Sequence, residues 1–246
     1  MGRGRGGGAV LIETVPETGS TNADLAARLA AGERIAEGHW LVADHQVLGK
    51  GRHGRVWRDG AGNFMGSTVI HRGHGDPPAN TLALVAALAL HAAVEPLLPP
   101  PQRALLKWPN DLLVGPAKLA GVLLEAVAGA VVVGVGVNLA QAPQLPDRQA
   151  VALTAFGPAP DRDAFAAALA ACFDRELERW RTYGLEPLVA RWQAAAHPLG
   201  TELAVSEQAL VGTFAGLTPE GALQLRLADG TLRAIHAGEV RLADGS

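Results

Sequence analysis

Residues 49–60, GKGRHGRVWRDG, bring four glycines and four cations into one short segment. Glycines let backbone N–H groups approach an anion closely, and the side chains of Lys50, Arg52 and Arg55 can offset phosphate charge. Trp57 can stack on a base or fold over a ligand. We therefore interpret this segment, called the basic loop below, as an anion-binding loop rather than an ordinary basic surface loop.

The spacing G-x-G-x-x-G at residues 49–54 is also typical of a dinucleotide-binding fingerprint. That fingerprint must open a helix, because the helix N-terminus holds the pyrophosphate. Residues 55–63, RVWRDGAGN, contain two further glycines and show no helical period. The basic loop is therefore not predicted to belong to a Rossmann fold.

Polar residues also follow predicted strands further along the chain. The segment KWPND at residues 107–111 presents Asn110 and Asp111 at a corner that its proline makes rigid. Lys118 begins an apolar strand in which Gly121 leaves room for a ligand. Taken alone, each of these features is equally typical of an ordinary turn or strand end.

Two more positions have side chains suited to recognition. Asn138 ends an apolar strand, where its amide can read adenine. Thr21, in the segment GSTN, is expected to cap a helix, with Asp24 completing a capping box. His71 and His74 fit no metal-binding pattern, so no metal ligand is assigned.

Hydrophobic periodicity indicates both strands and helices in the first 200 residues. Strands are expected at residues 10–15, 39–44, 63–71, 104–108, 118–127 and 130–139, the last two forming a hairpin through Ala128 and Gly129. Helices are expected at residues 21–32, 81–98, 161–183 (capped by Asp161 or Asp163) and 186–196.

The C-terminal region has a different texture. Short alternating runs are expected to be strands at residues 202–205, 209–217, 222–227, 231–236 and 239–242. Asp229-Gly230 is a strong signal for a tight hairpin. Five short strands predict a small β-barrel. We expect a disordered tail at residues 1–9, a large domain at residues 10–199 and the barrel at residues 200–246.

Composition narrows the class of protein. The chain has 246 residues, a net charge of −3 and one cysteine, Cys172. These values give no reason to expect nucleic acid or an anionic membrane as the main partner, and they exclude an intrachain disulfide. The most apolar run, residues 81–98, is interrupted by His91 and Glu95. The N-terminus lacks the apolar stretch of a signal peptide, so a cytoplasmic location is expected.

Five motifs in order resemble those of biotin–protein ligases. They are STN at residues 20–22, GKGRHGRVW at 49–57, KWPND at 107–111, KLAGVLLE at 118–125 and GVGVN at 134–138. The family usually has arginine at position 50. Lys50 keeps the positive charge but lacks the guanidinium group that forms two parallel hydrogen bonds. His53 also differs from the residue that is commonest in the family. GEVRL at residues 238–242 resembles the family's ending. No counterpart of the helix-turn-helix of repressor members is found, so a ligase without repressor activity is expected.

The resemblance implies an α+β fold with a mixed β-sheet flanked by helices, as in biotin/lipoate ligases and class II synthetases, and a small SH3-like C-terminal barrel. It implies catalytic roles for Arg52, Lys118, Asp111 and Lys50. It implies contacts to biotin from Ser20, Thr21, Asn22, Gln46, Gly49, Lys50, Gly51, Arg52, Lys118 and Gly121. It implies contacts to the nucleotide from Arg52, Arg55, Trp57, Lys107, Asn110 and Asn138.

The same resemblance implies a reaction and its partners. The expected enzyme is a biotin–[biotin carboxyl-carrier protein] ligase, which forms biotinyl-5′-AMP from biotin and ATP with Mg²⁺ and transfers biotin to a carrier lysine. A biotin carboxyl carrier protein is the expected partner, without DNA or membrane, and a homodimer is left open. Two alternatives remain: a lipoate–protein ligase, which shares the fold and the adenylation chemistry, and a non-catalytic biotin sensor.

Overall fold

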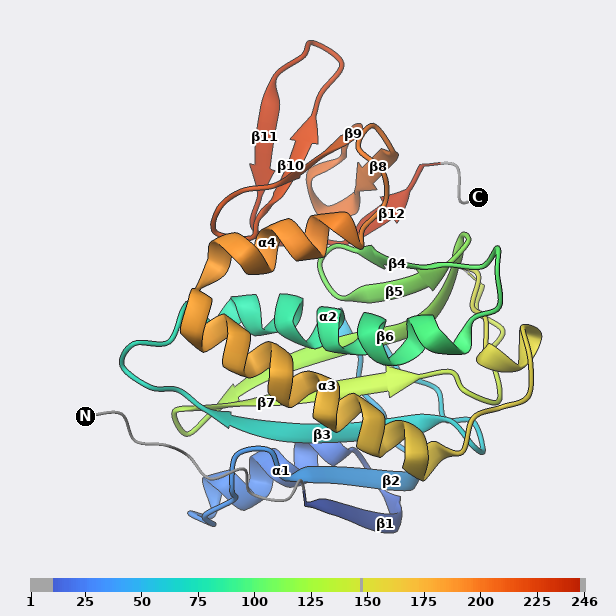
Figure 1. Ribbon diagram of the computed structural model, residues 1–246, viewed down its shortest axis with the longest axis vertical. Helices are drawn as coiled ribbons and strands as arrows, with labels where there is room; N and C mark the ends of the chain where they lie inside the picture. The colour runs from blue at the N-terminus through green and yellow to red at the C-terminus, as the bar shows by residue number, and fades with distance from the viewer. Residues whose placement is uncertain (1–10, 147, 244–246) are drawn as a thin grey trace.

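The computed structural model describes residues 11–146 and 148–243. A seven-stranded sheet forms the centre of the molecule (Figure 1). Its strands, in spatial order, are β1 (Ile12–Thr18), β2 (Trp40–Gln46), β3 (Phe64–His71), β7 (Ala130–Val137), β6 (Ala117–Val127), β5 (Asp111–Val114) and β4 (Ala104–Lys107). Only β1 and β2 run parallel, and every other neighbouring pair is antiparallel. This mixed sheet confirms the predicted fold class and excludes the parallel sheet of a Rossmann fold.

Helices cover both faces of the sheet. They are α1 (Thr21–Ala30), α2 (Leu82–Val94), α3 (Arg162–Tyr183) and α4 (Leu185–Ala194), with short 3₁₀ turns at Arg52–Gly54, Ala79–Thr81, Glu95–Leu97, Leu153–Ala155 and Ser206–Gln208. Because successive strand residues point to opposite faces, Leu41 and Val69 pack with Leu25 of α1. Trp40 and Ile70, one position away, pack in the larger core with α2 and α3. The sheet therefore has an α1 face and an opposite face.

The ends of the helices differ in part from expectation. Ser20, not Thr21, caps α1: its Oγ accepts a hydrogen bond from the Ala23 N–H. The expected capping box between Thr21 and Asp24 is therefore wrong, because Thr21 is already the first helical residue and its side chain turns inward. Asp161 caps α3 through the Ala164 N–H at 2.8 Å.

Helix α2 is apolar around most of its circumference because it is buried between the sheet and α3. Within the described residues, the stretch Ala79–Leu97 is long and apolar enough to cross a membrane by length and composition alone. Most of it is buried inside the protein. Its apolar character is accounted for by its place in the core.

Two hairpins position the later motifs. Strands β6 and β7 join at Ala128 and Gly129, both with left-handed backbone, as predicted. The sequence did not predict β5, which begins at Asp111 and pairs with β4. The four residues DLLV were too short a run to separate from the turn before them. The corner at residues 108–110 is therefore a hairpin turn between two strands.

The C-terminal strands form an open sheet rather than a closed barrel (Figure 1). Their order is β11 (Leu232–Ile235), β10 (Leu223–Arg226), β9 (Leu210–Leu217), β8 (Glu202–Val205) and β12 (Val240–Leu242). Among the described strands β11 and β12 stay unpaired on their outer sides, because the β10–β11 hairpin projects away from the body. All five expected strands are present; only the closure is wrong.

The two sheets share one apolar core, which contains Phe214 and Leu223 as well as Leu106 and Trp192. Trp108 Nε1 donates to the Gly221 carbonyl at 3.1 Å across the same boundary. Folding of residues 200–246 as a separate unit stays a prediction. The expected tail at residues 1–9 lies outside the described residues.

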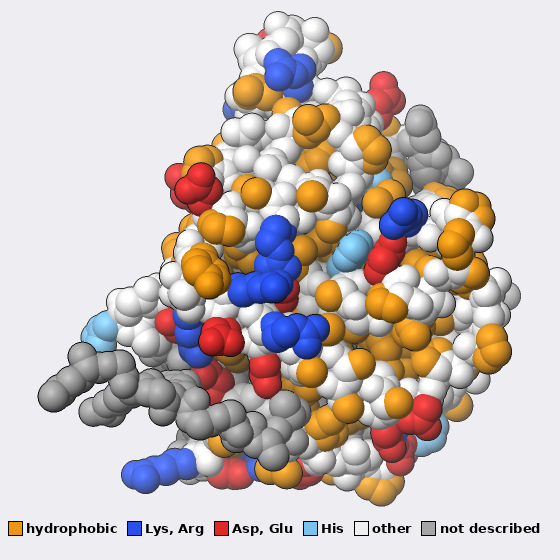
Figure 2. Space-filling view, viewed as in Figure 1, with side chains coloured by type: hydrophobic (Ala, Val, Ile, Leu, Met, Phe, Trp, Pro, Cys, Tyr) orange, Lys and Arg blue, Asp and Glu red, His pale blue; other side chains and the backbone are white. Residues whose placement is uncertain are grey.

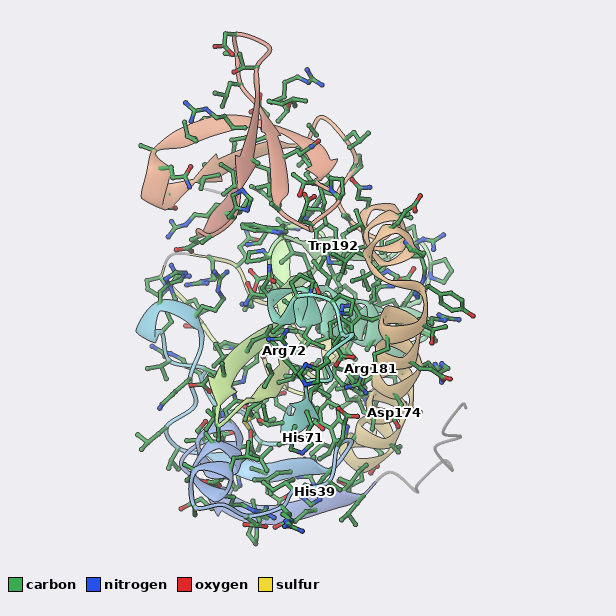
Figure 3. All side chains as sticks on the ribbon, turned by 90° about the vertical axis from the view of Figure 1, so that its left-hand side faces the viewer. His39, His71, Arg72, Asp174, Arg181 and Trp192 are labelled. Atoms are coloured by element: carbon green, nitrogen blue, oxygen red, sulfur yellow. The ribbon has the colours of Figure 1, made fainter. Side chains whose placement is uncertain are left out.

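The surface on the side of α3 and α4 carries interspersed positive, negative and apolar side chains (Figure 2). Figure 3 shows Arg181 of α3 near His71 at the end of β3. Arg181 pairs with Glu37 at 2.7 Å and Asp76 at 3.2 Å, and donates to the His71 carbonyl at 3.1 Å. These contacts fasten α3 to the end of the sheet.

Candidate functional site

A cavity of about 1180 Å³, counting space open to solvent, lies on the α1 face of the large sheet. It begins where α1 no longer covers the strands. Gly134 and Gly136 of β7 lie on this face, two and four residues after Val132. Ser67 of β3 and Leu123 of β6 flank Gly134 in register. Small residues in the middle of the sheet therefore form the floor.

The structure brings almost all predicted site residues to this cavity. Those that line it are Ser20, Thr21, Asn22, Gln46, Lys50, Gly51, Arg52, Arg55, Trp57, Lys107, Asn110, Asp111, Lys118, Gly121 and Asn138. Gly49 is the exception. A Cβ at Gly49 would lie 2.5 Å from the Trp57 carbonyl oxygen and 2.6 Å from Gln46 Nε2. Gly49 thus allows Trp57 of the basic loop to approach Gln46 of β2, although Gly49 itself does not line the cavity.

One end of the cavity, called the polar end below, is formed by Thr21, Asn22, Gln46 and Ser67. All four side chains are buried. The Thr21 N–H donates to Gln46 Oε1 at 3.0 Å, and the Thr21 and Ser67 hydroxyls lie 2.7 Å apart. The four side chains are themselves neutral and hydrogen-bonded. Ser67 was missed from the sequence, because a serine beside Thr68 in a mostly apolar strand carries no signal that distinguishes it from a structural hydroxyl.

The other end, called the basic end below, is formed by Lys50, Arg52, Arg55, Lys107 and Lys118. The basic loop that supplies three of them folds back on itself: the Gly51 N–H donates to the Arg55 carbonyl at 2.7 Å, and the Trp57 N–H to the Gly49 carbonyl at 2.9 Å. Its tip is a single 3₁₀ turn at Arg52–Gly54. The absence of an α-helix after the glycines is as predicted.

Trp57 lies on a shelf of two glycines. Gly121 of β6 and Gly136 of β7 are directly paired. A Cβ at Gly136 would overlap the Trp57 indole, and one at Gly121 would lie 3.0 Å from Lys118 Nζ. Lys118 Nζ is 5.8 Å from the centre of the indole, within cation–π range. The room left at Gly121 is thus bordered by the chain's own tryptophan and lysine.

Asp111 is the buried counter-charge of the basic end. Its carboxylate lies 2.5 Å from Lys118 Nζ and 2.8 Å from Lys107 Nζ. Burial raises the pKa of the Asp111 carboxyl, but the adjacent ammonium groups of Lys118 and Lys107 lower it more, so this pKa lies well below its usual range. Asp111 therefore holds both lysine side chains at the cavity wall.

The C-terminal sheet completes the basic end. Glu239 forms an ion pair with Arg55. Lys107 Nζ donates to the Val240 carbonyl at 2.8 Å. Arg52 donates to Asn110 Oδ1 at 3.3 Å and to the Gly238 carbonyl at 3.5 Å. The ending GEVRL therefore forms part of the cavity wall, although its sequence carried no chemical signal that distinguished it from an ordinary strand.

Asn138 presents an acceptor. Its Nδ2 donates to the backbone carbonyls of Lys118, at 3.4 Å, and Val151, at 3.2 Å. Its Oδ1 is buried and makes no hydrogen bond within the described part of the chain. A buried oxygen without a donor costs free energy that a ligand N–H can recover. Asn138 therefore holds an unsatisfied acceptor oxygen in the wall of the cavity.

Among the described residues, no group of three His, Cys, Asp or Glu side chains could hold a metal ion. His71 Nε2 instead lies 2.7 Å from the Ile35 carbonyl oxygen. In the described part of the chain, the carboxylates that line the cavity are those of Asp111 and Glu239, and both are ion-paired with cations of the chain.

Comparisons with known proteins agree with this arrangement. Residues 21–141 match the model of the biotin/lipoate A/B protein ligase family, and residues 202–242 match the biotin protein ligase C-terminal domain. A biotin–[acetyl-CoA-carboxylase] ligase of Mycobacterium tuberculosis is 37% identical over 96% of this chain and 91% of its own length. One of Paracoccus denitrificans is 39% identical over 91% of this chain and 97% of its own.

Solved structures agree on the fold. A biotin protein ligase from Aquifex aeolicus, solved in complex with biotin and ATP, superimposes with a TM-score of 0.83. The match covers 95% of this chain and 99% of that protein, at 24% sequence identity. The C-terminal sheet is included in this coverage.

Proposed function

Because the chain belongs to the biotin protein ligase family, we propose that it is an ATP-dependent ligase that forms biotinyl-5′-AMP and transfers biotin to a lysine of a biotin carboxyl carrier protein. Biotin and ATP are its two small substrates, as in the complex of the structural relative from Aquifex aeolicus. The relatives from two bacteria are named for acetyl-CoA carboxylase, which supports a carboxyl carrier as the acceptor.

The observation that carries this proposal is the division of one cavity into a neutral polar end and a basic end. A cyclic urea has N–H donors and a carbonyl acceptor but no charge, so it suits the polar end. ATP is a polyanion, so it suits the cations at the other end. A carboxylate tail that extends from the urea toward the cations would meet the α-phosphate between the two ends.

In the first step, the biotin carboxylate oxygen attacks the α-phosphorus of ATP, and the bond to pyrophosphate breaks. Negative charge gathers on the phosphate oxygens, so cations that are already in place lower the barrier. We assign this role to Lys118, Arg52 and Lys50, with Arg55 near the outer phosphates. Asp111 and Glu239 hold Lys118 and Arg55 in position before the substrate arrives.

The adenosine would lie against Trp57 and Asn110, with the free Oδ1 of Asn138 accepting from its amino group. Mg²⁺ would travel with the phosphates, since the carboxylates that line the cavity are engaged by cations of the chain. When bound, the metal would supply positive charge that offsets the phosphate charge.

In the second step, the neutral amine of the carrier lysine attacks the biotinyl carbonyl, the bond to AMP breaks, and the nitrogen releases one proton to the solvent as the amide forms. This amine must be neutral, although a lysine normally titrates near 10.4. Asp111 is suited to orienting the site rather than to deprotonation, because a carboxylate with a lowered pKa is a weak base. The basic loop would cover the adenylate during the transfer and exclude water.

The direct test is a mass-spectrometric assay with purified chain, ATP, biotin and a biotin carrier domain. We expect the carrier to gain one biotinyl group, and a carrier with its target lysine changed to arginine to gain none. Lipoate replaces biotin in a parallel reaction, and preferential transfer of lipoate would identify a lipoate ligase. Biotin binding without any transfer, while a control ligase labels the same carrier, would identify a sensor.

Retention of the adenylate tests the role of Arg52. Arg52→Gly removes a side chain that contacts Asn110 and Gly238, so we expect at least about tenfold faster release of biotinyl-5′-AMP. Release is followed with an unrelated lysine-rich protein, which should acquire biotin only from the variant. Unchanged retention would contradict the assigned role.

The proposed setting is the cytoplasm, with a carrier protein as partner and without DNA or membrane. A homodimer stays a prediction, which sedimentation of the full chain with and without biotin and ATP would test.

A further inference from the structure

Asn22 sits directly above a glycine. A Cβ at Gly134 would overlap the Asn22 side-chain amide. The amide therefore reaches across β7, from Ser67 on β3 to Glu125 on β6. Asn22 Oδ1 accepts from the Ser67 hydroxyl at 2.6 Å, and Asn22 Nδ2 donates to Glu125 Oε2 at 2.6 Å. Glu125 is partly buried and is not one of the residues that line the cavity.

We infer that Glu125 is a positioning residue that fixes the direction of the hydrogen bonds from Asn22 through Ser67 to Thr21, and so makes the site selective for a ligand with N–H donors. A carboxylate can only accept. Asn22 must therefore turn its Nδ2 toward Glu125 and its Oδ1 toward Ser67. Exchange of the two amide atoms would set two acceptors against each other at 2.6 Å.

The consequence passes along the chain of groups. Asn22 Oδ1 can only accept, so the single hydroxyl proton of Ser67 points to it. Ser67 Oγ is then left as an acceptor toward Thr21, and the Thr21 hydroxyl donates to it across 2.7 Å. That bond is shorter than the 3.2 Å between Thr21 Oγ1 and Gln46 Oε1. Gln46 Oε1 keeps the Thr21 backbone N–H as donor at 3.0 Å.

The ligand therefore meets a fixed pattern. The Thr21 hydroxyl donates its proton to Ser67, so toward the cavity Thr21 Oγ1 can only accept a hydrogen bond. Gln46 Oε1 already accepts from the Thr21 N–H, so toward the cavity Gln46 can donate from Nε2. This pattern is complementary to a cyclic urea, in which an N–H donor lies beside a carbonyl acceptor. An analogue with an acceptor in place of that N–H would meet the Thr21 lone pairs and be rejected.

The inference rests on the proposed function, since it assumes that the urea of biotin occupies the polar end. Its test is calorimetric titration of the full chain with biotin, without ATP. Glu125→Gln can both donate and accept, so both directions of the chain become available. We expect about tenfold weaker biotin binding, comparable to the loss of one hydrogen bond.

A swapped variant distinguishes direction from mere packing. It combines Asn22→Asp with Glu125→Gln, so that the introduced amide donates to the introduced carboxylate, whose other oxygen again accepts from Ser67. The original direction returns with nearly the same atoms. We therefore expect the swap to bind biotin more tightly than Glu125→Gln alone, within about threefold of the parent chain. Asn22→Asp alone sets two carboxyl groups together and should bind more weakly than the swap.

A second measurement uses the two biotin analogues in which one urea N–H is replaced by a ring oxygen. The parent chain should discriminate strongly against at least one of them, and Glu125→Gln should narrow that discrimination. If Glu125→Gln does not fold, Ser67→Ala carries this measurement, because it cuts the chain between Thr21 and Asn22.

Unchanged biotin affinity and discrimination in Glu125→Gln would overturn the inference, as would a swapped variant no better than Glu125→Gln. A parent chain that does not bind biotin would overturn the proposed function instead. The two failures are therefore distinguishable.

Discussion

The polar end and the basic end share one floor but are built on different principles. The polar end consists of buried neutral groups on α1, β2 and β3, connected by hydrogen bonds between 2.6 and 3.0 Å. The basic end consists of cations from a surface loop and two strands. Arg55, Lys107 and Lys118 are each paired with a carboxylate of the protein, and the C-terminal sheet supplies one of these carboxylates.

The difference teaches how each end can recognise its ligand. Buried neutral groups cannot form hydrogen bonds with water, so every donor must pair with an acceptor of the protein or the ligand. The arrangement of donors and acceptors therefore becomes specific for one ligand. Partly exposed cations are positioned by ion pairs with carboxylates of the chain before a phosphate binds. Their charge is therefore compensated even in the absence of the ligand. We therefore expect variants of the two ends to fail in different steps of the reaction.

The largest effect is expected at Lys118. Lys118→Met removes one cation from the developing phosphate charge and leaves the polar end intact. We predict about a 10²-fold decrease in the rate of biotin-dependent pyrophosphate exchange. Arg103→Met is the control, because that side chain is 78% exposed and pairs with Glu95 at the surface. Equal losses in the two variants would contradict the role assigned to Lys118.

Asp111→Asn should lower stability because it leaves two lysines beside a group without charge. At neutral pH we predict a loss of about 3 kcal/mol in the free energy of unfolding. The folded pKa of Asp111 is lowered, so its contribution is present above the unfolded pKa of 3.8 and is lost as pH falls toward the folded value. The difference between parent and variant should therefore shrink below pH 3.8 in urea unfolding; a constant difference would contradict this.

Two glycines on the same strand provide a matched pair. Gly134→Ala would push Asn22 aside in the polar end, whereas Gly136→Ala would push Trp57 aside in the basic end. We predict about a tenfold rise in KM for biotin in the first variant and for ATP in the second, each of which corresponds to about 1.4 kcal/mol. Steady-state pyrophosphate exchange measures both. A rise in both constants in each variant would mean that the two ends are not separate.

The smallest effect concerns His197, in the connection before the C-terminal sheet. Burial, with a smaller contribution from the charge of Lys107, lowers the pKa of His197 to about 4. The unfolded chain binds this proton near pH 6.5, so stability is fully present above 6.5 and declines as pH falls toward 4. His197→Gln should reduce that decline in urea unfolding between about pH 7 and 5. Identical pH profiles would contradict it.

Local sequence patterns were sufficient for most of the elements. The strand and helix periods predicted the five C-terminal strands, the β6–β7 hairpin and the four helices within a few residues. Short segments were less certain, because four residues such as DLLV in β5 carry too little periodicity. The capping residue of α1 was mispredicted, because the hydroxyls of Ser20 and Thr21 are both suitable caps by sequence. Only the inward packing of Thr21 leaves Ser20 as the cap.

The site divides in the same way. The residue types of the basic loop, KWPND and KLAG determined by themselves that cations, amides and a carboxylate would be available for phosphate chemistry. Only the tertiary structure decided that Ser67 lies opposite Gly134 beneath Asn22, with Glu125 two residues after the β6 partner of Gly134. It also decided that Glu239 returns from the C-terminal sheet to Arg55 and that this sheet stays open. The physical reason is that register and packing across strands depend on contacts far apart in the chain, whereas residue chemistry and short-range periodicity are local.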